Sequence, residues 1–269
     1  MILTPNRIHR APIGFGPAPS PRQAPDGSRF DWSNARTTTI GLVLEAHRDS
    51  INAMLPEGYV VDRLTPHPTV LFKVMELRNL PWLAGRGYNT LGIYLNDVIC
   101  QRVSPPVKAS TGREELGFPK VFAEIADATI TLTGEQEKRV HTLSWGGYEF
   151  LRLELTLASF DTVQSPALQP DKRLYTHPTK TGFLHQRYIP AVGIPGQADA
   201  NYATFCPPPP WPPSGAVKLE IQRGGFQHLP TLYNVVDALA DLKIVECKEV
   251  ALQQFIGASD LASNHRIEQ

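Results

Sequence analysis

The sequence has no excess of either charge and no long apolar run. Its 269 residues include 26 basic and 26 acidic side chains, so the formal net charge is zero. Without a basic excess there is little to attract phosphate backbones or anionic lipids. No stretch of about 18 apolar residues occurs, and the first residues lack the apolar core of a signal peptide. We therefore expect a cytoplasmic protein with no nucleic-acid partner and no membrane partner.

Cysteine is scarce, and the sequence patterns that would indicate a metal or a nucleotide are missing. The three cysteines, Cys100, Cys206 and Cys247, are far apart and form no CxxC pair, which predicts buried free thiols rather than a disulfide framework or a zinc site. The eight histidines show neither HxH nor HExxH spacing, and no GxGxxG or GxxxxGK[ST] loop is found. We expect neither a metal nor a cofactor.

The composition is that of a folded protein with a sizeable core. Hydrophobic residues make up 42% of the chain and charged residues 19%, and this length is compatible with one domain over residues 1–269. A net charge of zero removes repulsion between copies and so permits the homo-oligomer that we expect. Residues 11–34 contain five prolines and several glycines, which predicts that residues 1–34 form an extended N-terminal arm.

Most of the regular structure that the sequence predicts is β-strand. A run rich in β-branched residues at 37–45 is followed by a short helix at 49–55 with Asp49 as its cap. A stripe of apolar residues between Leu232 and Leu242 predicts one packed helix before a strand at 243–247. The proline-rich stretch 206–215 must be a loop. Further strands are expected at Thr69–Leu77, Leu91–Val103, Val121–Leu132, Leu151–Leu157 and Ala216–Gln222.

One lysine lies between apolar residues where a turn enters a strand. Lys120 follows Phe118-Pro119 and precedes Val121. A lysine in apolar surroundings loses hydration of its ammonium form, so its pKa falls and the neutral, nucleophilic amine becomes available. The alternative is that Lys120 extends past a strand end into water, as most lysines beside apolar residues do.

The stretch Gly112-Arg-Glu…Gly117-Phe-Pro-Lys120 resembles the signature of the acetoacetate decarboxylase family, in which the lysine after the proline forms a Schiff base. Weaker resemblances, among them Leu55-Pro-Glu-Gly58 and Tyr188–Pro195, follow in the family's order. The resemblance implies a mainly β (α+β) fold, an antiparallel double-psi-like β-barrel with flanking sheet and a few helices. It also implies that Lys120 is the catalytic residue and that the pocket contains Phe118 and Val121.

This sequence departs from the family pattern at the positions expected around the lysine. Val121 stands where a second lysine is usual, and two family glutamates fall on Lys73 and Thr90. Lys73 could lower the pKa of Lys120 or hold a substrate carboxylate, or it could be a solvated strand lysine. Glu76 is expected on the opposite side of its strand from Lys73 because side chains alternate. A family arginine corresponds to Arg36 if one gap is allowed.

The resemblance and these departures together predict a lyase without a cofactor. Its substrate is expected to be a ketone or β-keto acid larger than acetoacetate, bound by Lys73, Thr90, Phe118 and Val121, with Lys120 forming an imine. Decarboxylation, aldol-type chemistry or dehydration could follow. Two other functions are compatible with the same pocket, namely a non-covalent cyclase or isomerase of secondary metabolism, and a non-catalytic binder of small molecules.

Overall fold

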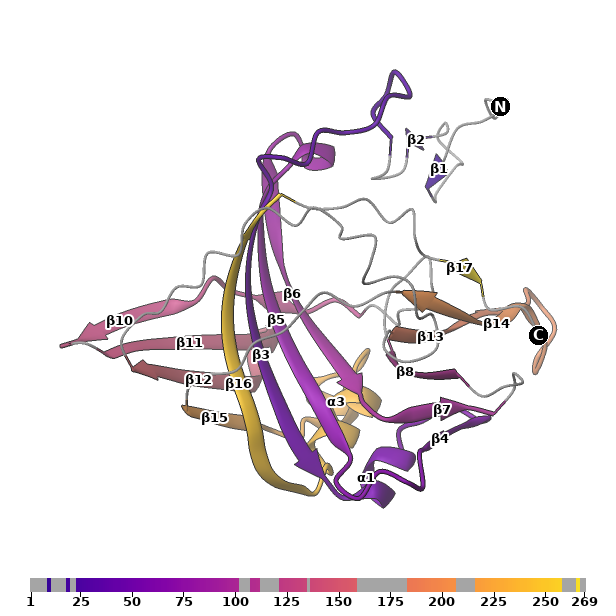
Figure 1. Ribbon diagram of the computed structural model, residues 1–269. Helices are drawn as coiled ribbons and strands as arrows, with labels where there is room; N and C mark the ends of the chain where they lie inside the picture. Colours follow the sequence, from indigo (N-terminus) through magenta and orange to yellow (C-terminus); the bar gives the residue numbers. More distant parts are fainter. Residues whose placement is uncertain are drawn as a thin grey trace.

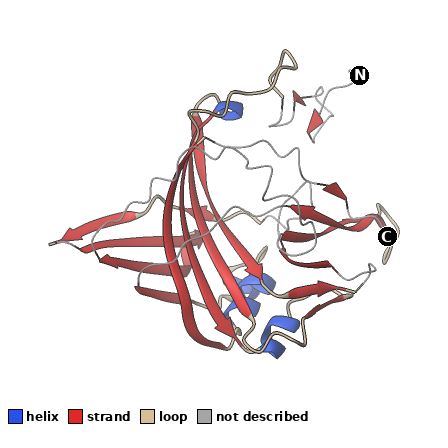
Figure 2. Cartoon of the chain, viewed as in Figure 1, coloured by secondary structure: helices blue, strands red, loops and turns tan. Residues whose placement is uncertain are grey.

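The computed structural model describes residues 9–10, 18–19, 23–101, 107–111, 121–134, 136–158, 183–206, 216–257 and 265–266. Strands dominate this part of the chain (Figure 2). They form one two-stranded ladder, β1 (His9–Arg10) with β2 (Ala18–Pro19), and three larger sheets. The mainly β class expected from the sequence is therefore confirmed.

The largest strands form a curved four-stranded sheet in the order β16-β3-β5-β6, which runs through the middle of the molecule (Figure 1). All of its strand pairs are antiparallel. Its β-branched and apolar residues fit a pleated sheet that is covered on both sides. The strands are β3 (Arg36–Ala46), β5 (Thr69–Leu80), β6 (Arg86–Leu95) and β16 (Ile244–Ile256).

A second sheet packs against one face of the curved sheet, and together they form much of the hydrophobic core. Its order is β10-β11-β12-β15, and the short strand β9 also pairs with β11. Core residues of the curved sheet, such as Phe72 and Ile40, belong to the same buried cluster as Leu153 and Leu155 of β12. The strands are β9 (Glu124–Ile125), β10 (Thr129–Thr133), β11 (Gln136–Trp145), β12 (Tyr148–Ala158) and β15 (Ala216–Ile221).

A third sheet lies on the other side of the curved sheet in Figure 1 and has the order β17-β14-β13-β8-β7-β4. Its β13–β8 pair is parallel, and its other pairs are antiparallel. The strands are β4 (Tyr59–Val61), β7 (Val98–Cys100), β8 (Val107–Thr111), β13 (Phe183–Pro190), β14 (Ala198–Cys206) and β17 (His265–Arg266). No sheet among the described strands closes on itself, so the expected barrel stays a prediction.

Helices are few and short. The apolar stripe near the end of the chain forms α3 (Tyr233–Ala240), whose Val236 and Leu239 are buried. The other helical elements are α1 (Arg48–Asn52), the 3-10 turn η1 (Pro81–Leu83) and α2 (Gly225–His228). In the described part of the chain, no helix is long and apolar enough to cross a membrane.

Several boundaries differ from the sequence prediction. Asp49 is not the cap of α1, because His47 occupies the N-cap and Asp49 lies in the first turn, where a carboxylate favours the positive end of the helix. The strand expected at Leu91–Val103 is divided by a turn in which Asp97 has a positive φ of 60°. Cys247 is exposed rather than buried, because the first half of β16 extends beyond the core, whereas Cys100 is buried. Residues 207–215 of the proline-rich stretch lie outside the described residues.

Candidate functional site

The two faces of the curved sheet carry different side chains, and the register of its strands shows on which face each side chain lies. In β5, Lys73 and Met75 point to one face while Val74, Glu76 and Arg78 point to the other, since side chains alternate along a strand. Glu76 Oε1 accepts a hydrogen bond of 3.0 Å from the backbone N–H of Ala128, just before β10. The face with Glu76 therefore packs on the second sheet, and Lys73 points away from it.

The prediction that Glu76 lies on the opposite side from Lys73 is thus confirmed, and Glu76 does not replace a carboxylate beside Lys73. Arg36 lies directly across from Arg78 in the register of β3 and β5, so it shares the face of Glu76. It is exposed. The structure does not bring Arg36 to the side of the sheet that carries Lys73.

The face with Lys73 carries four polar side chains, which we call the polar face: Thr39, Lys73 and Gln253, which are buried, and Thr90, which is half-buried with its Oγ1 atom enclosed. Gln253 of β16 pairs with Thr39 of β3, Thr39 with Met75 of β5, and Met75 with Thr90 of β6, so three of the four lie in one row. Lys73 is two residues from Met75, which makes it a diagonal neighbour of Thr39 and Thr90. The structure therefore brings together two residues of the predicted pocket, Lys73 and Thr90.

Burial and hydrogen bonding distinguish the polar face from ordinary strand surface. The relative exposure is 7% for Lys73, 2% for Thr39 and 4% for Gln253, so the interpretation of Lys73 as a solvated strand lysine is wrong. Within the described part of the chain, the buried atoms Thr90 Oγ1 and Gln253 Oε1 have no hydrogen-bond partner. Unmet buried polar atoms are uncommon in proteins and call for an explanation such as a bound molecule. No pattern in the sequence pointed to Gln253, because the strand there was expected to end at residue 247.

The other predicted site residues lie at or beyond the edge of the described structure. Lys120 and Phe118 lie outside the described residues. Val121, the first residue after Lys120, is 49% exposed, and Phe122 is 72% exposed. The chain then enters β9, where Glu124 and Ile125 pair with Ser144 and Leu143 of β11.

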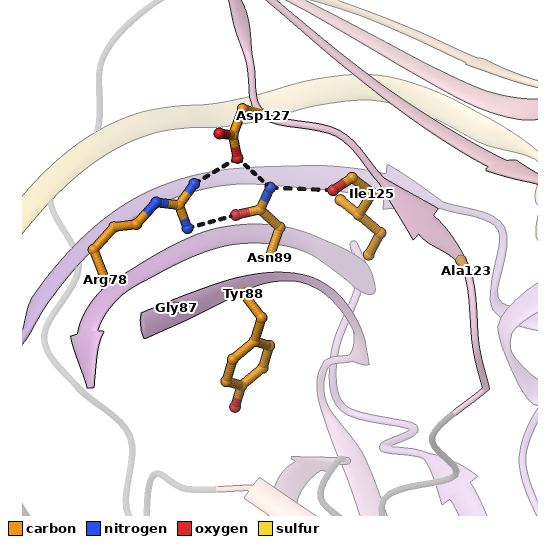
Figure 3. A pocket seen from close by; sticks show the side chains of 7 residues that line it. All are labelled: Arg78, Gly87, Tyr88, Asn89, Ala123, Ile125 and Asp127. Atoms are coloured by element: carbon orange, nitrogen blue, oxygen red, sulfur yellow. Dashed lines mark hydrogen bonds and ion pairs between the residues drawn. The ribbon is translucent and has the colours of Figure 1, made fainter. Parts of the chain in front are cut away.

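A pocket of about 460 Å³ lies at the open edge of β6, apart from the polar face. Figure 3 shows its polar wall, in which Arg78 and Asn89 point to one side of the sheet and Tyr88 to the other. Arg78 donates to Asn89 Oδ1 at 2.8 Å and to Asp127 Oδ1 at 2.5 Å, and Asn89 donates to Asp127 and to the carbonyl of Ile125. These contacts join the segment around β9 to β5 and β6, and we interpret them as structural.

A second group of polar side chains lies between the curved sheet and the second sheet. His141 of β11 is completely buried, and neither ring nitrogen has a hydrogen-bond partner among the described residues. Burial lowers the pKa of His141; the nearby Glu76 carboxylate opposes this shift, and Arg139 adds to it. Arg139 itself forms a buried ion pair with Glu137. His141 is therefore a neutral core side chain at pH 7.

The described residues contain no group of three or more histidine, cysteine or acidic side chains arranged to hold a metal ion.

Comparison with known proteins defines the class. The model of the acetoacetate decarboxylase family matches residues 106–251, more than half of the chain. The matched range includes Lys120 and ends within β16. The protein belongs to the acetoacetate decarboxylase family. A search of the curated proteins finds no match.

Solved structures share the fold. An acetoacetate decarboxylase-like enzyme from Sphingomonas wittichii RW1 is 14% identical, with 91% of this chain and 97% of that chain covered and a TM-score of 0.52. An acetoacetate decarboxylase is 16% identical, with coverages of 91% and 94% and a TM-score of 0.51. The enduracididine biosynthesis enzyme MppR, with HEPES buffer bound, is 12% identical, with coverages of 87% and 86% and a TM-score of 0.51. At these identities the likeness establishes a shared fold and leaves the reaction open.

Proposed function

We propose that this protein is an enzyme without a cofactor that binds a ketone or keto acid and forms an imine with it through Lys120. The observation that carries the proposal is the family match over residues 106–251, which includes Lys120 in its Gly-Phe-Pro-Lys setting. The polar face is a second support, because it contains Lys73 and Thr90, the two residues that the sequence resemblance aligns with family glutamates.

The proposed chemistry begins with the neutral amine of Lys120. Its nitrogen forms a bond to the carbonyl carbon, the carbonyl oxygen leaves as water, and a C=N bond remains. The protonated imine nitrogen accepts an electron pair when a bond to the neighbouring carbon breaks, which is the common step of decarboxylation and aldol-type cleavage. Dehydration of a hydroxyl group can follow from the same intermediate.

The fold alone does not select among these reactions. It is shared by a decarboxylase and by MppR, an enzyme of enduracididine biosynthesis. The replacements at Lys73, Thr90 and Val121 favour a substrate larger than acetoacetate, because the charged groups expected around that small molecule have changed.

Trapping of the imine tests the proposal. The protein is incubated with 4-oxopentanoate and borohydride, and the modified residue is located by peptide mass spectrometry. We expect an adduct on Lys120 that is lost in Lys120→Ala. The matched control is Lys218→Ala, since the Lys218 side chain is 65% exposed and pairs with Glu220 on the surface. Labelling of Lys218 and other surface lysines to the same extent as Lys120 would contradict the proposal, whereas turnover without any adduct would support the non-covalent alternative.

A further inference from the structure

One edge of the second sheet is an exposed strand. β10 is the outermost strand of this sheet (Figure 1), and among the described strands it pairs only with β11. All five of its residues are exposed, and the relative exposure is 49% for Ile130 and 68% for Leu132. The backbone N–H and C=O groups that point away from β11 have no partner in the described sheets, so they can pair with another strand.

The sequence of β10 carries none of the features that usually block such an edge. Charged side chains, prolines and bulges are the common means of protection. The strand Thr129–Thr133 contains neither a charge nor a proline, and its register with β11 shows no bulge. The opposite edge of the same sheet, β15, does carry charges, since Lys218 and Glu220 form an exposed ion pair there. The comparison indicates that β10 is the edge of this sheet that can accept a strand.

β10 is complementary to a second copy of itself. In an antiparallel pair about a two-fold axis at Thr131, Ile130 lies opposite Leu132 of the second copy, and Thr129 lies opposite Thr133 of that copy. Each of these pairs occurs twice, once on either side of the axis. Cross-strand pairs of apolar side chains and pairs of threonines both stabilise antiparallel sheets.

The neighbouring strand β11 places charges of opposite sign at the two ends of the apolar rows. In the register of β10 and β11, Ile130 lies beside Arg139 and Leu132 lies beside Glu137. In the two-fold arrangement, each row that contains Ile130 and the second copy's Leu132 therefore begins with Arg139 and ends with Glu137 of the second copy. The arrangement is complementary in charge as well as in shape.

The central row is compatible with the same arrangement. Thr131 lies beside Lys138 of β11, so the row through the two-fold axis has a Lys138 at each end. Each Lys138 pairs with Glu154 of its own chain at 2.7 Å. The two lysines are separated by both copies of β10, and their charges are compensated locally.

We infer that β10 is the surface through which two copies of this chain form a two-fold dimer. The second sheet then continues from β15 of one copy, through the two β10 strands, to β15 of the other. A stable protein interface commonly buries about 800 Å² on each partner, and a strand of five residues provides only part of such an area. The dimer should therefore dissociate on dilution.

Sedimentation velocity of the full chain between about 1 and 200 µM tests the dimer. We expect the mass to change from that of one chain to that of two as the concentration rises. Thr131→Lys should remove the association, because it places two like charges opposite each other at the axis. Thr231→Lys is the matched control, since Thr231 is an exposed threonine in the turn before α3. A single chain at every concentration, or association that survives Thr131→Lys, would overturn the inference.

Cross-linking tests the register. In a chain whose exposed Cys247 is replaced by serine, Thr131→Cys should form a disulfide between copies, because residues directly opposite have Cα atoms about 5 Å apart. Thr129→Cys is the control: the two copies of residue 129 would lie about 13 Å apart, beyond the reach of about 7 Å of a disulfide. We expect oxidation to link Thr131→Cys more than tenfold faster. Equal rates for the two variants would contradict the two-fold axis at Thr131.

Discussion

His141 should make the protein sensitive to mild acid, and replacing it with leucine should remove part of that sensitivity. The side chain is fully buried between two sheets, opposite Leu153, and neither ring nitrogen has a described hydrogen-bond partner. An unmet buried polar group costs about 1–3 kcal/mol. His141→Leu should therefore raise the free energy of unfolding by an amount of that order at pH 7.5, where the histidine is neutral.

The pH dependence follows from the direction of the pKa shift. Burial lowers the pKa of folded His141 below its ordinary value near 6.5, with Glu76 opposing and Arg139 adding to the shift. Above about pH 6.5 neither state binds a proton at this residue. Below that pH the unfolded chain is protonated first, so stability falls by up to about 1.4 kcal/mol per pH unit until the folded pKa is reached.

Urea denaturation followed by circular dichroism at pH 7.5, 6.5 and 5.5 measures both effects at one protein concentration. The difference in stability between His141→Leu and the native protein should grow as the pH falls. Leu64→Ala is the control, because Leu64 is 89% exposed and does not titrate, so its replacement should leave the slope unchanged. A constant difference between His141→Leu and the native protein at all three pH values would refute the reasoning.

Three further substitutions test the fold. Phe72→Ala should cost about 3–5 kcal/mol in urea denaturation because Phe72 is fully buried, whereas Phe226→Ala, at a residue 63% exposed, should cost far less. Gly87→Ala should lower the melting temperature by several degrees, since the new Cβ would lie 1.9 Å from the carbonyl oxygen of Leu77; an unchanged melting temperature would contradict that contact. Hydrogen bonds from Lys248 and then His67 hold the pKa of Glu45 below its usual value, so the stability that this carboxylate adds is present at neutral pH and lost as the pH falls below about 4. Glu45→Gln should therefore be less stable than the native protein at pH 7 and should differ little from it at pH 3, as judged by urea midpoints.

Strands with a clear apolar pattern could be predicted from the sequence, and strands with buried polar residues could not. The predicted strand Ala216–Gln222 and the observed β15 (Ala216–Ile221) differ by one residue. The prediction succeeded because the residues are β-prone and a glycine precedes the first of them. β11 was missed. Its buried side includes Glu137, Arg139 and His141, so the residues that point into the protein do not look apolar in the sequence.

The candidate site, too, could be predicted from the sequence only in part. The resemblance placed Lys73 and Thr90 in the pocket, and the register puts both on one face. Sequence spacing could not reveal that Gln253 shares this face, because Gln253 is more than 160 residues from Thr90 and meets it only through the order β16-β3-β5-β6. The pairing of strands distant in the sequence is decided by tertiary packing, which local patterns do not report.

The position of β16 has a consequence for how this protein is made. Strand β3, near the beginning of the chain, has β5 on one side and β16 on the other, and the pairing with β16 extends from Arg36 to Ala46. During synthesis β3 therefore has an open edge until about 200 further residues have been added, and an open edge invites pairing with other nascent chains. The central sheet can be completed only after residue 256 has left the ribosome, so until then β3 cannot finish pairing with its own chain.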